Sequence, residues 1–310
     1  MTIYQVKPKA SACPSSSANH TPDLNMFIDP LPEDKATGLV KDCYQKIRHS
    51  LDSPSLPVFF TYIGPFEEYL VYITDQLTVN LDEQSFKRNI GEIRLEIVGS
   101  IRKILKKPDS TQKWISLYKH SPSFYNFQKD LLLVSLINVK LACIFLALRE
   151  AIKGWAVAAK KLPERTKFES GSPKVKFTRE DFLFDYPLPD NVRNTHESSI
   201  SLTPQNKSVV KRDTFGLEKN LLVEYLKYCR DDITGYMKKD YFWILRVRLE
   251  QTLLASLTLF PHLIYSPYNV IYKLTEKYEN FYELLYLLYE QFPTLAVQRL
   301  ILSAYMIIDN

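Results

Sequence analysis

Apolar side chains recur along this chain at the spacing of one helical face. Near the N-terminal end, Leu39, Cys43, Ile47 and Leu51 repeat every four residues, which predicts a helix with one buried stripe. Alternation of apolar and polar residues, the mark of a half-buried strand, is weak throughout. The pattern therefore predicts an all-α protein, with further helices over residues 66–77, 81–105, 111–118 and 131–160.

One apolar run, residues 131–148, is about long enough to span a bilayer. Asn138 and Lys140 lie near its centre, where a charge inside a membrane is costly. We therefore favour a buried core helix and expect no contact with a membrane. The alternative, a membrane-associated helical protein, depends on this run alone.

The helical pattern stops over residues 161–213 and resumes after them. This stretch is rich in Pro, Ser, Asn and charged residues, and it is much longer than an ordinary connection between helices. Residues 1–30 are also rich in Pro, Ser and Asn, which favours a flexible segment. The predicted order is a flexible N-terminus at 1–30, a helical region at 31–160, a linker at 161–214 and a second helical region at 215–310.

The two helical regions align with each other at one offset without a gap. Three identities at that offset are Phe59 with Phe242, Glu67 with Glu250, and Leu70 with Leu253. We interpret the regions as two repeats of one helical unit, packed face to face as an intramolecular pseudo-dimer joined by the long linker. Asp240 falls opposite Pro57, so only the second repeat carries a carboxylate at that position.

Composition and spacing argue against several classes of function. The chain has 310 residues and a net charge of +5, with basic residues mostly balanced by nearby Glu and Asp, so we expect no nucleic-acid partner. The 8 glycines form no phosphate-binding loop. The 4 cysteines and 5 histidines show no metal-ligand spacing, so we expect no metal and no other cofactor. The unpaired cysteines and the absence of an apolar leader pattern predict a cytoplasmic location.

Residues 33–70, EDKATGLVKDCYQKIRHSLDSPSLPVFFTYIGPFEEYL, resemble the group I (DehI-type) α-haloacid dehalogenases. The acidic lead, the helix after it, the proline step and the aromatic close follow the frame of that family. The positions that keep this frame are Tyr44, Ile47, Arg48, Leu51, Pro54, Phe66, Tyr69 and Leu70. The resemblance implies an all-helical pair of repeats around a central site. It also implies cofactor-independent hydrolysis of small 2-haloalkanoic acids.

The same resemblance implies a catalytic role for Asp240. In such enzymes an Asp followed by an aromatic residue, here Tyr241, activates a water that displaces halide from the α-carbon. Lys239 and Tyr241 are then the adjacent candidates for substrate contact. Taken from the residues alone, Asp240 also fits an ordinary N-cap of the helix that follows.

Other candidate substrate-binding positions depart from the family. Ser55 and Val58 stand where the family has bulky aromatics, which predicts a larger or differently shaped cavity. The family's Asn falls on Phe127, and Asn126 beside it is the candidate for that role. Two functions therefore stay open: a hydrolase of small 2-haloacids, and a non-catalytic helical module that binds a small carboxylic acid or a protein partner. The oligomeric state also stays open, with a homodimer as one option.

Overall fold

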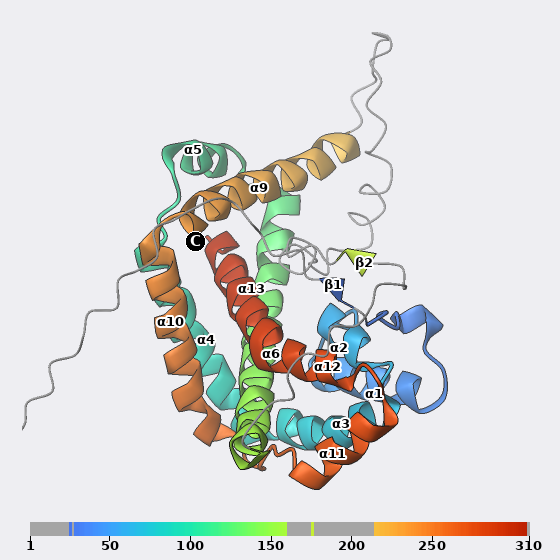
Figure 1. Cartoon of the computed structure of the whole chain (residues 1–310). Helices are drawn as coiled ribbons and strands as arrows, with labels where there is room; N and C mark the ends of the chain where they lie inside the picture. Colours follow the sequence, from blue (N-terminus) through green and yellow to red (C-terminus); the bar gives the residue numbers. More distant parts are fainter. Residues whose placement is uncertain (1–24, 27, 160–174, 177–213, 309–310) are drawn as a thin grey trace, which may run out of the picture.

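The computed structural model describes residues 25–26, 28–159, 175–176 and 214–308, and most of them are helical (Figure 1). The prediction of an all-α fold is confirmed. Within these ranges the only strands are β1 (Asn25–Met26) and β2 (Val175–Lys176), which form one short antiparallel pair. The helices in chain order are η1 (Glu33–Lys35), α1 (Gly38–Ser50), α2 (Val58–Ile63), α3 (Glu67–Asp82), α4 (Gln84–Ile104), α5 (Asp109–Tyr118), α6 (Pro122–Ala159), α9 (Thr214–Met237), α10 (Asp240–Ala255), η2 (Ser256–Leu259), α11 (Tyr268–Lys277), α12 (Phe281–Tyr286), the π-helical turn η3 (Leu287–Gln291) and α13 (Phe292–Met306).

The helices α6 and α13 form the centre of the molecule, and the other helices pack around them (Figure 1). Apart from Thr294, every residue of α13 is buried. Phe145 on α6 lies 4.7 Å from Phe59 on α2 and 5.4 Å from Phe292 on α13, measured between ring centroids. Burial of each such ring contributes about 1.5–3 kcal/mol, so these three rings hold α2 against the central pair.

The apolar run at residues 131–148 lies within α6, which begins earlier, at Pro122. In the described part of the chain, α6 is the one helix with the length and composition to cross a membrane. In its most apolar stretch, 83% of the residues are buried by the rest of the molecule. The run therefore serves as the core helix that the sequence favoured.

The charged side chain at the centre of that run, Lys140, finds its partners at the C-terminal end of α1. Lys140 is only 1% exposed, and its ammonium donates to the carbonyl oxygens of Ser50 (3.3 Å) and Leu51 (3.1 Å). It also forms an ion pair with the Asp52 carboxylate at 2.8 Å. Asp52 has a φ of 55°, in the left-handed region that ends many helices. Lys140 thus closes the C-terminal end of α1, where carbonyl groups have no partner within the helix.

The buried stripe of α1 differs from the predicted one at its first position. Leu39 is 57% exposed, and Val40 is buried instead. The helix begins at Gly38, so Leu39 lies in its first turn on the solvent side. From Cys43 onward the predicted stripe is correct, since Ile47 and Leu51 are fully buried.

The two predicted repeats share one continuous core, because α10 and α13 pack on α4 and α6. At the aligned positions the first repeat is broken into α2 and α3 by Gly64 and Pro65, whereas the second continues as the single helix α10. A Cβ at Gly64 would overlap the Tyr44 hydroxyl, so the close approach there requires glycine. The predicted flexible N-terminus at 1–30 and the linker at 161–214 lie almost wholly outside the described residues.

Candidate functional site

Asp240 is the first residue of α10, and its side chain is exposed. Lys239 takes the N-cap position, and no side-chain hydrogen bond caps the helix. The Lys239 ammonium lies 5.8 Å from the ring centre of Tyr241, which is 38% exposed. A carboxylate at this end stabilises the helix through its dipole. Asp240 lines none of the three cavities described below, and an exposed carboxylate differs from the base beside an enclosed apolar chamber that a haloacid hydrolase needs.

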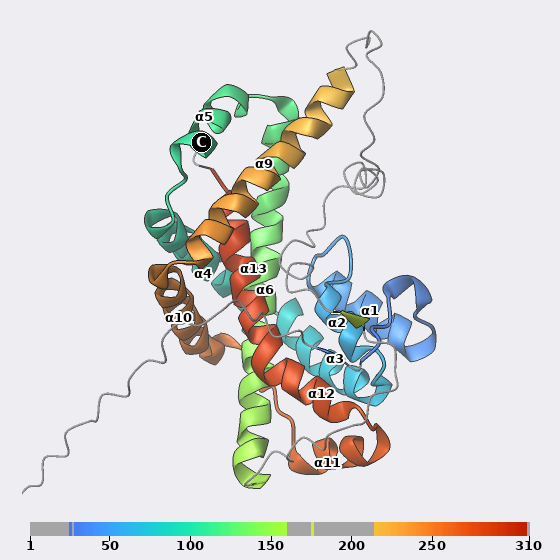
Figure 2. The same cartoon turned by 45° about the horizontal axis from the view of Figure 1, so that its top comes forward.

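The other predicted substrate-binding residues lie elsewhere. Asn126 is exposed near the start of α6. Val58 is the first residue of α2, and Ser55 lies in the loop just before it. The helix α2 lies across the α6–α13 pair from α10 in both views (Figures 1 and 2). The structure therefore brings Lys239, Asp240 and Tyr241 together on the surface, and it separates them from the remaining three.

Ser55 lines one small cavity, and Val58 is not among the residues around it. The cavity that Ser55 lines has a volume of about 10 Å³, which is room for about one water molecule. Leu56 and Pro57 from the same loop and Ile137 and Leu141 from α6 also line it. The expectation of a larger or differently shaped substrate cavity at Ser55 and Val58 stays a prediction.

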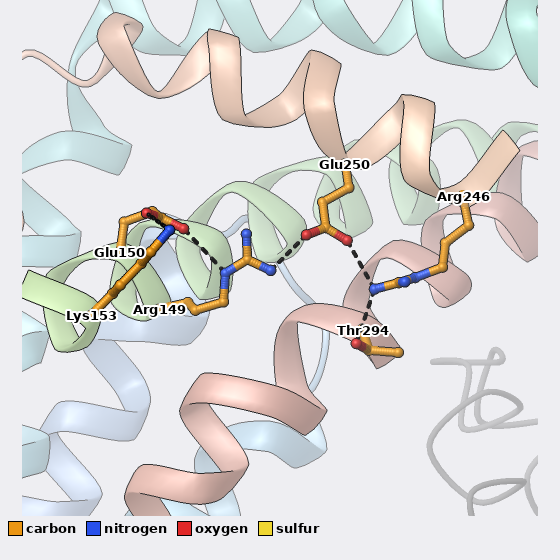
Figure 3. A network of polar contacts seen from close by, with 6 residues as sticks. All are labelled: Arg149, Glu150, Lys153, Arg246, Glu250 and Thr294. Carbon is orange, nitrogen blue, oxygen red and sulfur yellow. Dashed lines mark hydrogen bonds and ion pairs between the residues drawn. The ribbon is translucent and has the colours of Figure 1, made fainter. Parts of the chain in front are cut away.

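A larger depression, of about 540 Å³, lies where α6, α10, η3 and α13 meet. Its volume falls in the range of small-ligand pockets. Six residues form a connected polar network here, and Figure 3 shows how they face one another: Arg149, Glu150, Lys153, Arg246, Glu250 and Thr294. We call this group the α6–α10 cluster.

Glu250 is the centre of the α6–α10 cluster. Its two carboxylate oxygens accept from different arginines, Arg149 at 2.6 Å and Arg246 at 2.8 Å. Arg246 also donates to the Thr294 hydroxyl at 3.0 Å, and Arg149 donates to Glu150 at 3.2 Å. The side chains of Glu250 and both arginines are between 16% and 18% exposed, so these charge-assisted bonds are partly shielded from water (Figure 3).

Helical spacing explains why these side chains meet. Arg246 and Glu250 are four residues apart on α10 and share a face. Arg149 and Lys153 are four residues apart on α6, and Lys153 lies 3.5 Å from Glu150. The packing of α6 on α10 then brings Arg149 to Glu250 across 101 residues of sequence.

One wall of the depression is the π-helical turn η3, which contributes Tyr289 and Glu290. Pro293 follows this turn, near the start of α13. Proline has no N–H group, and its ring clashes with the carbonyl four residues earlier, here that of Tyr289, so an unbroken α-helix cannot pass through this point. Turns of this kind are rare and occur frequently at functional sites.

The lining of the depression is electrically balanced. It holds three cationic and three anionic side chains, which are Arg149, Lys153 and Arg246, and Glu150, Glu250 and Glu290. Because both oxygens of Glu250 already accept from arginines, this carboxylate positions the guanidinium groups and is poorly placed to take a proton from water. Each arginine keeps further N–H donors beyond those the glutamates and Thr294 occupy, and Glu290 is exposed at the rim.

Sequence reasoning missed this cluster. The pair of Arg246 and Glu250 at a spacing of four was a readable signal, but such pairs are common on solvated helix faces. Pro293 inside an apolar helical pattern was a second signal, since it predicts a local break. The approach of Arg149 to Glu250 comes from tertiary packing and has no local signal.

Within the described ranges, no group of three His, Cys, Asp or Glu side chains comes together as a metal site. Comparison with known proteins gives no further assignment: the chain matches no protein-family model, no curated protein and no solved structure. The dehalogenase resemblance of residues 33–70 therefore stays a prediction.

Proposed function

We propose that this chain is a non-catalytic helical protein that binds a small carboxylic acid which also carries a positive charge, such as an α-amino acid. The observation that carries the proposal is the depression at the α6–α10 cluster, where fixed arginines and a π-helical turn converge. Guanidinium groups held in place recognise carboxylates at a low ordering cost.

The balance of charged side chains in the lining indicates which class of acid binds there. With three cations and three carboxylates in the lining, a singly charged anion would leave the site with an excess negative charge. A ligand that carries both charges keeps the balance, because its carboxylate faces Arg149 and Arg246 while its ammonium group faces Glu290. Tyr289 offers an apolar surface for the rest of the ligand.

We also propose that the site lies between the two predicted repeats. The α6 wall of the depression comes from the first predicted repeat, and α10, η3 and α13 come from the second. A ligand site between two related helical units fits the pseudo-dimer that the sequence alignment predicts.

The hydrolase alternative needs a base beside a space that excludes water. The exposed Asp240 side chain gives it no support. Halide release from 2-chloropropionate tests it directly: we expect none from the wild-type chain. If the wild-type chain releases halide and the Asp240→Asn variant does not, the hydrolase function is supported and the non-catalytic part of our proposal is wrong.

Thermal unfolding with a panel of small acids tests the proposal itself. An α-amino acid at about 100 times its dissociation constant adds about 2.7 kcal/mol to the free energy of unfolding. We expect one or more amino acids to raise the midpoint, and propionate and inorganic phosphate at the same concentration to leave it unchanged. A panel in which simple anions stabilise as well as amino acids, or in which nothing stabilises, would overturn the proposal.

The Glu290→Gln substitution tests recognition of the ligand's ammonium group separately from recognition of its carboxylate. Glu290 is exposed, so its substitution leaves the fold intact. The variant is expected to lose most of its response to amino acids, whereas Glu276→Gln, an exposed change outside the depression, keeps it.

A further inference from the structure

The solvent side of α11 and α12 carries tyrosines where an exposed helix face normally carries charged residues. Tyr268 and Tyr272 are four residues apart on α11 and are 51% and 46% exposed. Tyr282 and Tyr286 have the same spacing on α12 and are 41% and 45% exposed. Single exposed aromatics are ordinary, but four at this spacing on two consecutive helices form a patch.

These rings belong to one surface. Tyr268 and Tyr272 are stacked, with ring centroids 5.8 Å apart and an angle of 26° between planes. The helices α11 and α12 pack against each other. A hydrogen bond to the Glu276 carboxylate raises the pKa of Tyr272, and Tyr268 on α11 and Tyr282 on α12 act in the same direction. Tyr265, 48% exposed, extends the patch before α11. We call Tyr265, Tyr268, Tyr272, Tyr282 and Tyr286 the tyrosine surface.

Carboxylates predominate around the tyrosine surface. Five glutamates lie on α11, α12, the turn between them and the start of α3, against two lysines on α11: Glu67, Glu68, Glu276, Glu279 and Glu283, and Lys273 and Lys277. Lys277 is already paired with Glu68. The chain as a whole has a net charge of +5, so this acidic patch differs in sign from the rest of the molecule.

A depression of about 380 Å³ opens beside Tyr265 and Tyr268. Ala151 on α6 and Ile264 in the preceding loop give it apolar walls, and Glu150 places a carboxylate in its lining. An apolar wall with one carboxylate suits a long basic side chain, which buries its stem and keeps its charged end near an acid.

We infer that the tyrosine surface binds a basic, proline-containing extended segment of another protein. Rows of exposed aromatic rings recognise proline-rich segments, which are already extended and lose little entropy on binding. The glutamates around the rings complement arginines and lysines, and tyrosine faces attract such cations. This inference depends on the tyrosine surface and shares only Glu150 with the small-acid proposal.

Fluorescence polarisation with the full chain tests the inference. The probes are a labelled proline-rich peptide with arginines, the same peptide with its arginines replaced by glutamate, and the same peptide with its prolines replaced by alanine. We expect saturable binding of the first probe, weakened by about tenfold or more in each of the other two. Added salt is expected to weaken binding of the first probe further.

Two matched variants locate the binding site. Tyr268→Ser combined with Tyr272→Ser is expected to weaken binding by about tenfold or more. Tyr125→Ser removes an equally exposed tyrosine, 53% accessible near the start of α6, and is expected to leave binding unchanged. Far-ultraviolet circular dichroism confirms that both variants are folded.

Three results would overturn the inference: no binding of the arginine peptide, equal binding to the double tyrosine variant, or tighter binding of the alanine-substituted peptide. The last would indicate a helical partner. None of them bears on whether an amino acid binds at the α6–α10 cluster.

Discussion

The helix α6 carries two ion-paired clusters that differ in almost every physical respect. At its middle, Lys140 is 1% exposed, and it reaches two carbonyl oxygens and one carboxylate. Near its C-terminal end, Arg149 is paired with Glu250 beside a depression of about 540 Å³. The first cluster joins two helices and lines none of the cavities described above, whereas the second joins three helices and opens onto one of them. The comparison teaches that a buried charge is a candidate for function only where a ligand can reach it.

The strongest test of this comparison is removal of the Lys140 side chain. Lys140→Ala leaves a cavity and two carbonyl groups at the end of α1 without their donor, so we expect a loss of about 3–5 kcal/mol in the free energy of unfolding. Urea unfolding measures the loss. Lys153→Ala is the matched control on the same helix, where the side chain is 56% exposed, and it should change stability by less than about 0.5 kcal/mol. Equal losses in the two variants would refute the structural role of Lys140.

The α6–α10 cluster is expected to contribute less to stability. Glu250→Gln removes the charge that both arginines share, in a setting that water still partly screens, so we expect a loss of about 1–2 kcal/mol. Glu150→Gln, with a side chain 36% exposed, is the control and should cost about 0.5 kcal/mol or less. A loss for Glu250→Gln as large as that for Lys140→Ala would mean that the second cluster is also mainly structural.

The smallest expected effect concerns acid pH. Burial pushes the pKa of Asp52 up, but the hydrogen bond and the charge of Lys140 outweigh it, so the pKa is lowered in the folded chain. The stability from this pair is present above the unfolded pKa of about 3.9 and is lost as pH falls through the folded value. Asp52→Asn tolerates the left-handed backbone and removes the charge, so its stability should fall less steeply below about pH 4 than that of wild type. Because Asp52 is 56% exposed, the difference should stay below about 1 kcal/mol, and parallel pH curves would contradict the pairing.

Much of the fold followed from helical periodicity. The predicted helices at 81–105 and 111–118 correspond closely to α4 and α5, and the core role of residues 131–148 follows from their lack of a polar face. Leu39 was assigned to the wrong face because periodicity does not say where a helix begins. Aligned segments of the two predicted repeats differ because one glycine and one proline, Gly64 and Pro65, break the first of them.

The site was much harder to predict than the fold. An Asp before an aromatic residue predicts a helix start equally well whether or not a cavity lies beside it, and Asp240 is exposed at such a start. The α6–α10 cluster depends on contacts between segments 101 residues apart, which no local pattern encodes. The π-helical turn at η3 follows from Pro293, but its position next to the arginines is set by the packing of α13 against α6.

Calorimetric titration with an α-amino acid tests the central claim most directly. Arg246→Gln and Arg248→Gln change neighbouring arginines on α10, of which only Arg246 belongs to the α6–α10 cluster, while Arg248 is exposed. We predict saturable binding to the wild-type chain and to Arg248→Gln, and at least about tenfold weaker binding to Arg246→Gln. Equal affinity in all three proteins, or no heat of binding to the wild type, would contradict the claim that this depression is a ligand site.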